Sequence, residues 1–437
     1  MIVRAFPADT WTQAGIRHNL PWHLNFQFKQ NSMPSNNRRR PTSDVRLAHR
    51  KDVIELFSGA GGFSWGWHEA GFTTRVAIDN DVIAARTHEI NFPHSLTLHR
   101  DLEAYQPSAL AQLIGRRPRG LLAIVGGPPC QGWSRAGRGK LRSLDVTARS
   151  LINDPRNRLY RRFLQYLSYF HPPVFVMENV PGMLSIDGQN IADSIQRNFE
   201  DTGYRTSLAL VNARWFGVPQ DRRRLIFLGV RRDLRFSLEA SALETYAVEF
   251  RSRTLRLPSG DTSVHQAIGD LPGIPHGMAE DPQPYAPGPR RPTRYAQLMR
   301  ARSNGMLTDH ITRTHNAQDL EAFSVMPEGG KYFELEDRFK RYRDDIFKDK
   351  YRKLRWDRPA GTVTAHFAKD CYTHIHPGQP RTVSIREAAR LQSFPDDFRF
   401  FGNMGERFRQ IGNAVPPLMA YGIACFIRDA IAGGHST

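Results

Sequence analysis

The chain has 437 residues, 40% of them hydrophobic and 11% aromatic, and no apolar run nears the ~18 residues that cross a bilayer, so we expect two or three water-soluble domains. Lys and Arg number 61 against 43 Asp and Glu, and the net charge of +18 favours a polyanionic partner such as nucleic acid. The three cysteines, Cys130, Cys371 and Cys425, are too few for a disulfide framework or a four-cysteine zinc site, which indicates a reducing compartment.

The first 50 residues have the composition of an arm. They contain Arg38-Arg39-Arg40 together with proline, asparagine and serine, show no clear periodicity, and lack the apolar stretch of a secretion signal. We expect residues 1–50 to be a basic, disordered arm.

Short apolar runs alternate with amphipathic stretches between Lys51 and Arg232. This alternation predicts a doubly wound α/β domain, in which helices cover both faces of a parallel sheet. Apolar residues at helical spacing between Leu159 and Phe170 predict one of the covering helices. The expected strands are Val53–Phe57, Arg75–Ile78, Leu121–Val125, Val174–Met177 and Leu225–Val230.

The first expected strand runs directly into a glycine-rich turn, Ser58-Gly59-Ala60-Gly61-Gly62, and a helical pattern follows. Such a turn lets the backbone approach a ligand at the helix N-terminus, and an acid about 20 residues on, here Asp79, can bind ribose hydroxyls. A tight structural turn is the alternative. No G-K-[ST] follows, which excludes a P-loop, and the spacing argues against the dinucleotide pattern of NAD or FAD enzymes.

Three further features follow expected strands. Cys130 lies on a turn stiffened by two prolines, which favours a reactive thiol over an inert buried one. Glu178 stands at the carboxyl end of a strand, where open α/β sheets gather their sites, although it can instead cap the next helix. The arginines 222–224 enter a strand near the same edge, which favours phosphate or substrate contact over a solvated face.

Together these segments resemble the C5-cytosine-specific DNA methyltransferase family of bacterial type, from about Lys51 to Ile427. Residues 57–62 resemble its S-adenosylmethionine motif, 128–131 its catalytic loop and 178–180 its glutamate motif. Gln220, Arg222 and Arg224 match its Q-x-R-x-R motif. Residues 355–364, 386–395 and 412–417 resemble its later motifs.

The resemblance implies a Rossmann-like S-adenosylmethionine-dependent domain over 51–232. It implies a smaller target-recognition domain and hinge over 233–404, with a variable part 233–350, and a segment 405–437 that packs back on the catalytic domain. The implied catalytic residues are Cys130, Glu178, Arg222 and Arg224. The implied cofactor-binding residues are Phe57, Gly59, Gly61, Gly62, Asp79, Asp101, Pro128 and Asn413. The implied substrate-binding residues are Gln131, Asn179, Gln220 and Arg135.

The implied reaction is methyl transfer from S-adenosylmethionine to C5 of a cytosine flipped out of a specific duplex DNA sequence, through a covalent bond between Cys130 and C6. A restriction-modification system is the implied setting. Three alternatives stay open: an RNA cytosine-5 methyltransferase of the same fold, a non-catalytic DNA-binding relative, and a nicotinamide or flavin enzyme.

The expected partners are double-stranded DNA and a cognate endonuclease acting on the same site, with a monomeric enzyme in the bacterial cytoplasm near the nucleoid and no membrane. We expect no metal, because His374 and His376 are more typical of an ordinary polar strand face than of a metal site. Residues 233–350 carry a net charge of −1, with 17 basic and 18 acidic residues. Grip on the DNA backbone is therefore expected mainly from the catalytic part.

Overall fold

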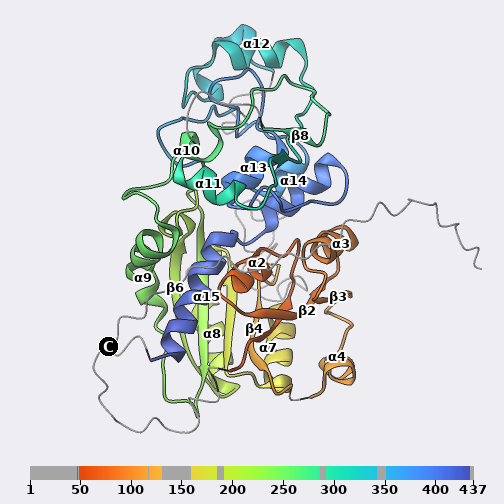
Figure 1. Cartoon of the computed structure of the whole chain (residues 1–437), viewed down its shortest axis with the longest axis vertical. Helices are drawn as coiled ribbons and strands as arrows, with labels where there is room; N and C mark the ends of the chain where they lie inside the picture. Colours follow the sequence, from red (N-terminus) through yellow and green to blue (C-terminus); the bar gives the residue numbers. More distant parts are fainter. Residues whose placement is uncertain are drawn as a thin grey trace, which may run out of the picture. The chain divides into compact units, whose positions relative to one another are not determined.

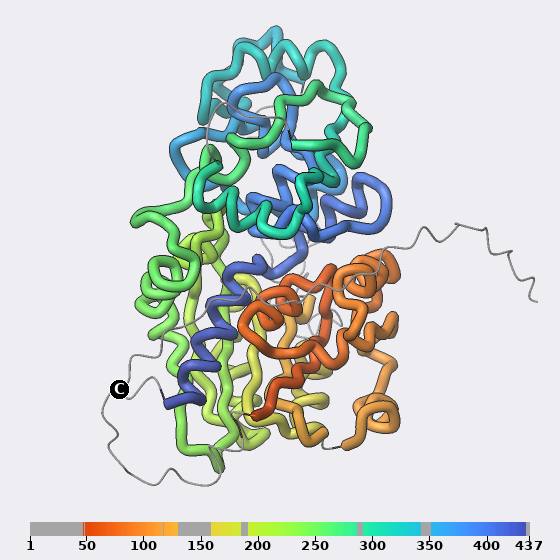
Figure 2. Tube along the Cα trace, in the orientation of Figure 1, coloured from red at the N-terminus to blue at the C-terminus, as the bar shows by residue number. Residues whose placement is uncertain are grey.

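The computed structural model describes residue 47 and residues 49–116, 118–129, 159–184, 191–285, 292–341 and 351–433. Contacts divide the chain into two units, Met1–Arg39 and Arg40–Thr437, and all the described residues lie in the second. Figure 1 shows the helices and strands of this unit, many of them labelled, and Figure 2 follows its Cα trace.

A seven-stranded sheet in the order β3-β2-β1-β4-β5-β7-β6 organises the first part of this unit. The pairs β3–β2, β2–β1, β1–β4 and β4–β5 are parallel, whereas β7 is antiparallel to both β5 and β6. The predicted α/β class is confirmed. The strands are β1 (Asp52–Leu56), β2 (Thr73–Asp79), β3 (Leu96–His99), β4 (Leu121–Gly126), β5 (Val174–Asn179), β6 (Tyr204–Asn212) and β7 (Arg223–Arg231).

Successive side chains of β1 enter different hydrophobic cores, as the two-residue period of a strand requires. Val53 joins a cluster that includes Trp67 of α2 and Ile423 of α15. Ile54 joins a second cluster, which includes residues of α7 and α8. The sheet therefore has helices on both faces (Figure 1). The helices of this part are α2 (Gly62–Glu69), α3 (Val82–Asn91), α4 (Pro107–Ile114), α7 (Leu159–Phe170), α8 (Ile191–Asp201) and α15 (Pro417–Ile431).

The five strands expected from apolar runs all form, with ends shifted by no more than two residues. Two further strands of this sheet, β3 and β6, were not predicted. Both lie at the edges of the sheet. Their burial is partial along most of their length. β3 carries no continuous apolar run, and in β6 only Leu208–Val211 form one, after a polar beginning.

Beyond β7 the chain first packs on the sheet and then forms a second body of short elements. Tyr246 of α9 donates a hydrogen bond from its hydroxyl to Asp429 Oδ2 of α15 at 2.6 Å, so this first helix still covers the sheet. We propose that this second body is the target-recognition domain and that it begins after residue 255. The remaining elements are α9 (Leu243–Glu249), α10 (Val264–Ile268), β8 (Gln283–Pro284), α11 (Arg294–Arg300), β9 (Met306–Leu307), α12 (Ala317–Val325), α13 (Ile385–Leu391) and α14 (Met404–Asn413).

Buried ion pairs hold the second body together around α13. Arg390 is fully buried and pairs through Nη2 with Asp396 Oδ2 at 2.6 Å, while Arg381 pairs through Nη1 with Glu387 Oε2 at 2.7 Å. Breaking one partner of such a buried pair is strongly destabilising, because the other charge is left uncompensated. These four charged side chains therefore lie in the interior of the second body.

The last helix returns to the sheet. A Cβ atom at Gly66 of α2 would lie 2.4 Å from the backbone nitrogen of Tyr421, so α15 approaches α2 as closely as glycine allows. Residues 404–431 include a stretch long and apolar enough to pass for a membrane span, but 78% of it is buried inside the protein, as in the core helix of a soluble domain.

Candidate active site

The carboxyl ends of the central strands meet at one edge of the sheet. In the strand register, Leu56 of β1 pairs with Ile78 of β2 and with Gly126 of β4, and Gly126 pairs with Met177 of β5. The strand ends that carry the predicted cofactor turn, the start of the catalytic loop and the glutamate motif therefore lie side by side. Open α/β sheets bind their ligands at this edge.

The turn after β1 is tied to the end of β2. The backbone nitrogen of Gly59 donates to Asp79 Oδ2 at 2.7 Å, and that of Asp81 donates to Asp79 Oδ1 at 2.8 Å. Burial raises the pKa of the Asp79 carboxyl, and these two hydrogen bonds oppose the rise. Each carboxylate oxygen keeps acceptor capacity beyond these bonds, so Asp79 both shapes the turn and can accept a ligand hydroxyl.

The three glycines of this turn are needed for different reasons. Gly59 has φ +53° and open space around the position of a Cβ atom, so its exposed side can face a ligand. A Cβ atom at Gly61 would lie 2.5 Å from Phe92 Cε2, and one at Gly62 would lie 2.1 Å from the carbonyl oxygen of Val415. Protein packing therefore demands the second and third glycines.

Four other predicted cofactor residues differ in their exposure. Phe57 adopts a φ of +57° directly after β1, and Pro128 is buried. Asp101 is exposed and accepts a hydrogen bond through Oδ1 from the nitrogen of Glu103 at 2.9 Å, whereas Asn413 is exposed at the end of α14. The two exposed polar side chains are available to a ligand.

Glu178 and Arg224 form an ion pair across β5 and β7. Arg224 Nε lies 2.7 Å from Glu178 Oε1, and the two side chains are only 13% and 12% exposed. A Cβ atom at Gly127 would lie 3.1 Å from Glu178 Oε2, so the glycine after β4 lets this carboxylate approach the loop. The sequence-predicted acid and the second arginine of the Q-x-R-x-R motif are thus brought together.

The neighbouring Asn179 holds the start of the predicted catalytic loop. Its Nδ2 donates to the carbonyl oxygen of Pro128 at 3.2 Å, and its Oδ1 accepts from the nitrogen of Val180 at 2.8 Å. With 2% exposure, this side chain acts on the loop backbone from inside the protein. Cys130, Gln131 and Arg135 lie outside the described residues.

A family model of C-5 cytosine-specific DNA methylases matches residues 51–428. The chain belongs to this family. Type II methyltransferase M.AgeI of Thalassovita gelatinovora is 31% identical over 87% of this chain and 100% of its own length. Type II methyltransferase M.XorII of Xanthomonas oryzae pv. oryzae is 33% identical over 86% of this chain and 84% of its own length.

Solved structures agree with this assignment. A candidate DNA modification methyltransferase encoded within a prophage (E. coli) superposes with a TM-score of 0.67 at 26% identity, covering 87% of this chain and 99% of its own. The S. pombe Dnmt2 methyltransferase, with a TM-score of 0.51 and 14% identity over 88% of this chain and 99% of its own, shares the fold. The chain is a DNA (cytosine-5) methyltransferase, and the prediction of a methylating enzyme is confirmed.

Two residues that were predicted to act on the substrate, Arg222 and Gln220, are buried. Arg222 is 2% exposed and Gln220 has no exposed surface, and both bond to backbone groups of the protein. This placement fits a role in holding the chain rather than direct contact with a substrate.

Sequence reasoning missed a buried polar chain beneath the cofactor turn. The Ser64 hydroxyl contacts Glu55 Oε2 and lies 2.9 Å from His88 Nε2, and His88 Nδ1 lies 2.7 Å from Thr97 Oγ1. Burial raises the pKa of Glu55 to about 8 and lowers that of His88 to about 3. The acid inside the apolar run Val53–Phe57 was the signal that could have revealed it.

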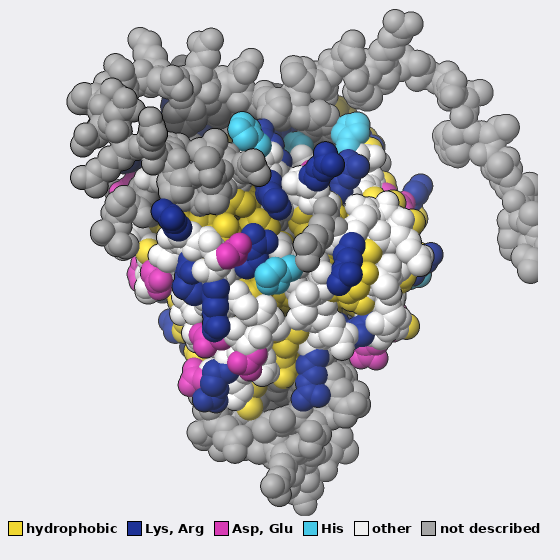
Figure 3. Space-filling model, turned by 90° about the horizontal axis from the view of Figure 1, so that it is seen from below, with side chains coloured by type: hydrophobic (Ala, Val, Ile, Leu, Met, Phe, Trp, Pro, Cys, Tyr) yellow, Lys and Arg dark blue, Asp and Glu magenta, His cyan; other side chains and the backbone are white. Residues whose placement is uncertain are grey.

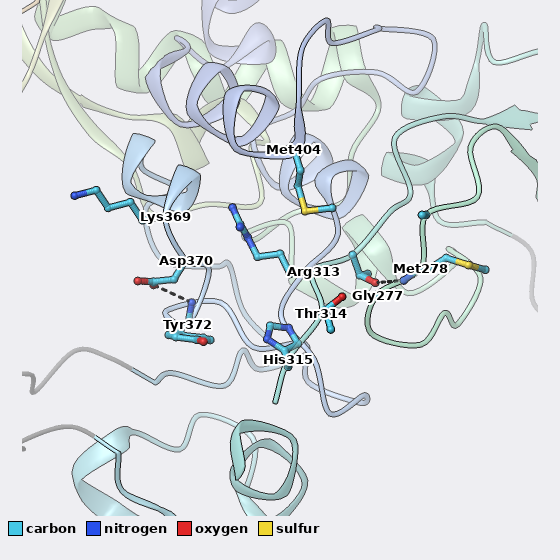
Figure 4. Close-up of a pocket in the computed structure, with 11 residues that line it drawn as sticks. Gly277, Met278, Arg313, Thr314, His315, Lys369, Asp370, Tyr372 and Met404 are labelled. Carbon is cyan, nitrogen blue, oxygen red and sulfur yellow. Dashed lines mark hydrogen bonds between the residues drawn. The ribbon is translucent and has the colours of Figure 1, made fainter. Parts of the chain in front are cut away.

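A cavity of about 420 Å³ lies in the second body, between residues 277–279, 312–315 and 369–372 (Figure 4). Arg313 and Lys369 line it, together with His315 and Asp370. The Arg313 guanidinium donates to the carbonyl of Phe367 at 2.7 Å and is therefore held in place. The exposed Lys369 has no side-chain partner among the described residues, so it is available to a polyanion.

On the face drawn in Figure 3, the described Lys and Arg side chains lie among acidic and hydrophobic ones and do not gather in one patch. Among the described residues, no group of three or more His, Cys, Asp or Glu side chains could hold a metal ion. His374 and His376 are buried, and His374 Nε2 lies 3.0 Å from the carbonyl oxygen of Gly361.

Proposed function

We propose that this methyltransferase transfers a methyl group from S-adenosylmethionine to C5 of a cytosine flipped out of a specific duplex DNA sequence, and that Cys130 forms a transient covalent bond to C6 of that cytosine. The observation that carries the proposal is the Glu178–Arg224 ion pair, which stands beside the backbone leading to Cys130. Enzymes that act on a base take it out of the stack, which would bring the edge of the cytosine to this carboxylate.

The residues around the first turn fit S-adenosylmethionine. The open side of Gly59 and the free acceptor capacity of Asp79 suit a nucleoside, and Asp101 and Asn413 offer exposed polar side chains. Phe57, Gly61, Gly62 and Pro128 complete the proposed cofactor set. When bound, the cofactor supplies an electrophilic methyl group.

The cytosine ring needs activation because C5 is a poor nucleophile. The Cys130 thiolate attacks C6, which forms an S–C6 bond and makes C5 nucleophilic enough to take the methyl group. A base then removes the C5 proton, the S–C6 bond breaks, and the thiolate is restored.

Glu178 is the proposed partner of the cytosine edge. Its Oε1 is taken by Arg224, whereas its Oε2 faces the backbone at Gly127 and is the atom that can hydrogen-bond N3 and N4. Protonation at N3 favours attack at C6, because it makes the ring more electrophilic. Arg224 therefore orients Glu178 and can also contact the base, while Gln131 and Arg135 are proposed to close over the substrate.

A duplex containing 5-fluorocytosine tests the covalent step. Fluorine cannot leave C5 as a proton does, so the enzyme should remain bonded to DNA and migrate as a denaturation-resistant complex when S-adenosylmethionine is added. Cys130→Ala should form no such complex. Turnover on ordinary DNA without any trapped complex would exclude attack by Cys130. Methylome sequencing of cells that express the enzyme would give the target sequence for this duplex.

The setting of the reaction is also proposed. The type II names of M.AgeI and M.XorII support a restriction-modification system with a cognate endonuclease, and we infer a monomer acting in the bacterial cytoplasm. Parallel assays with duplex DNA and transfer RNA test the choice of substrate. We propose that residues of the variable part 233–350 read the target bases.

A further inference from the structure

The buried Arg222 guanidinium joins two segments that are distant in the sequence. Its Nη1 donates to the carbonyl oxygen of Val363 at 2.7 Å. Its Nη2 donates to the carbonyl oxygens of Ala414 at 2.9 Å and Gly412 at 3.2 Å. Val363 lies in the segment 355–364, which resembles one of the later motifs of the family, whereas Gly412 and Ala414 flank the proposed cofactor residue Asn413.

A second buried side chain grips the same turn. Gln392 Nε2 donates to the carbonyl oxygens of Ala414 at 3.0 Å and Ile411 at 2.9 Å, while its Oε1 accepts from Gln220 Nε2 at 2.6 Å. The Ala414 carbonyl therefore receives donors from Arg222 and from Gln392. Gln220 Oε1 in turn accepts from the nitrogen of Val363 at 3.0 Å, which closes the network.

The gripped turn touches the cofactor turn directly. The carbonyl oxygen of Val415 lies 2.1 Å from the position that a Cβ atom of Gly62 would take. The two backbones therefore leave no room for a side chain between them. A shift of the turn at Ala414 would therefore move either Asn413 or the first residue of α2. Both belong to the proposed cofactor site.

Arg222 is poorly placed to touch the substrate itself. Both of its Nη atoms are taken by carbonyl oxygens, and burial lowers the pKa of the guanidinium. Reaching a cytosine would leave buried carbonyl groups without donors, which costs free energy. Arg224, two residues on, already contacts Glu178 and serves the substrate side.

We propose that Arg222 and Gln392 are positioning residues that set the turn Gly412–Val415 for the cofactor, so that cofactor affinity depends on two side chains that do not touch it. The inference rests on the proposed function, because it takes Asn413 and the first turn as the S-adenosylmethionine site. It differs from the family-based expectation that Arg222 acts in catalysis.

Arg222→Lys tests this directly in the full-length, DNA-free enzyme. A lysine ammonium cannot span the carbonyls of Val363 and Ala414 as a guanidinium does. Losing a charge-assisted hydrogen bond is expected to weaken S-adenosylmethionine binding about tenfold in calorimetric titration. Affinity for duplex DNA should stay within about twofold. Arg232→Lys, at the far end of β7 and exposed, is the matched control and should bind the cofactor as the wild type does.

Steady-state rates separate positioning from substrate contact. For Arg222→Lys we expect a raised KM for S-adenosylmethionine and a kcat that recovers at saturating cofactor. A merely structural defect would lower the folded fraction without changing the dissociation constant of the folded protein. A kcat that stays low at saturating cofactor, with wild-type cofactor affinity, would assign Arg222 to the substrate and overturn the proposal.

Gln392→Met provides an independent variant if Arg222→Lys does not fold. It removes the second donor to Ala414 and should also weaken cofactor binding, and unchanged affinity would overturn the proposal. Where both variants fold, the double variant should lose less affinity than the product of the single losses, since both donors act on one carbonyl. A wild-type enzyme that binds no S-adenosylmethionine would instead refute the proposed function, which is a distinct outcome.

Discussion

Nε of Arg224 lies 2.7 Å from Oε1 of Glu178, so an arginine entering β7 orients the carboxylate that ends β5. The two strands are antiparallel neighbours, and Glu178 pairs with Ile226 in their register. The start of β7 is thereby brought to the carboxyl end of β5. Because β7 is antiparallel to β5, its first residues lie at the edge of the sheet where the parallel strands end. Arg224 is thereby placed beside Glu178.

Replacing Glu178 by glutamine should remove the function of this pair while keeping its shape. Glutamine carries no charge for Arg224 and cannot share a proton with cytosine N3, so we expect kcat to fall by about 100-fold or more. The assay is transfer of labelled methyl to duplex DNA. Glu244→Gln, on the exposed face of α9, is the control and should retain full activity. A Glu178→Gln enzyme within a few-fold of the wild type would remove Glu178 from the mechanism.

Cys130→Ala should abolish labelled methyl transfer while cofactor binding stays measurable. Without the thiolate no bond to C6 forms, and C5 remains too weak a nucleophile. Calorimetric titration with S-adenosylmethionine provides the folding control, because the proposed cofactor site is built from other residues. Normal turnover by this variant would refute the covalent mechanism.

The sequence predicted those parts of the fold that have a local signature. Apolar runs predicted the five strands that have a neighbouring strand on both sides, and a glycine cluster predicted the turn before α2. The edge strands β3 and β6 were not predicted. Both are partly exposed, β3 has no continuous apolar run, and the run of β6 covers only Leu208–Val211.

The roles of the two motif arginines needed the structure. Residues two apart on a strand share a face, which suggests similar surroundings for Arg222 and Arg224. Yet β7 begins only at Arg223, and the preceding backbone leads Arg222 into the interior, where carbonyls from distant segments accept its donors. The spacing of residues along a strand does not predict which carbonyl groups, more than a hundred residues away in the sequence, will accept hydrogen bonds from a side chain.

Lys369→Gln should weaken DNA binding through loss of charge. Lys369 is one of the residues around the cavity of the second body, and its exposed side chain has no partner among the described residues, so we expect it to contact a phosphate. Plots of log affinity against log salt concentration should lose about one unit of slope. Lys51→Gln, next to the amino end of β1, should leave the slope unchanged. Equal slopes for Lys369→Gln and the wild type would place this cavity away from DNA.

Glu55→Gln should change how stability depends on pH. The folded enzyme keeps the Glu55 proton up to about pH 8, whereas an unfolded chain releases it near the ordinary value of 4.5. Between these values the folded state binds more protons, so Glu55 makes the free energy of unfolding fall as pH rises from 4.5 to about 8.

His88 acts in the opposite direction at lower pH. Its pKa is about 3 when folded against 6.5 in the unfolded chain, so it makes stability rise with pH from about 3 to 6.5. The two effects oppose each other where their windows overlap. Glu55→Gln should therefore show stability that rises up to about pH 6.5 and then stays level, whereas the wild type should decline from there to about pH 8. Denaturant midpoints at pH 5, 6.5 and 8.5 provide the measurement. A wild-type stability that does not fall between the last two would mean that Glu55 is already ionised in the folded enzyme.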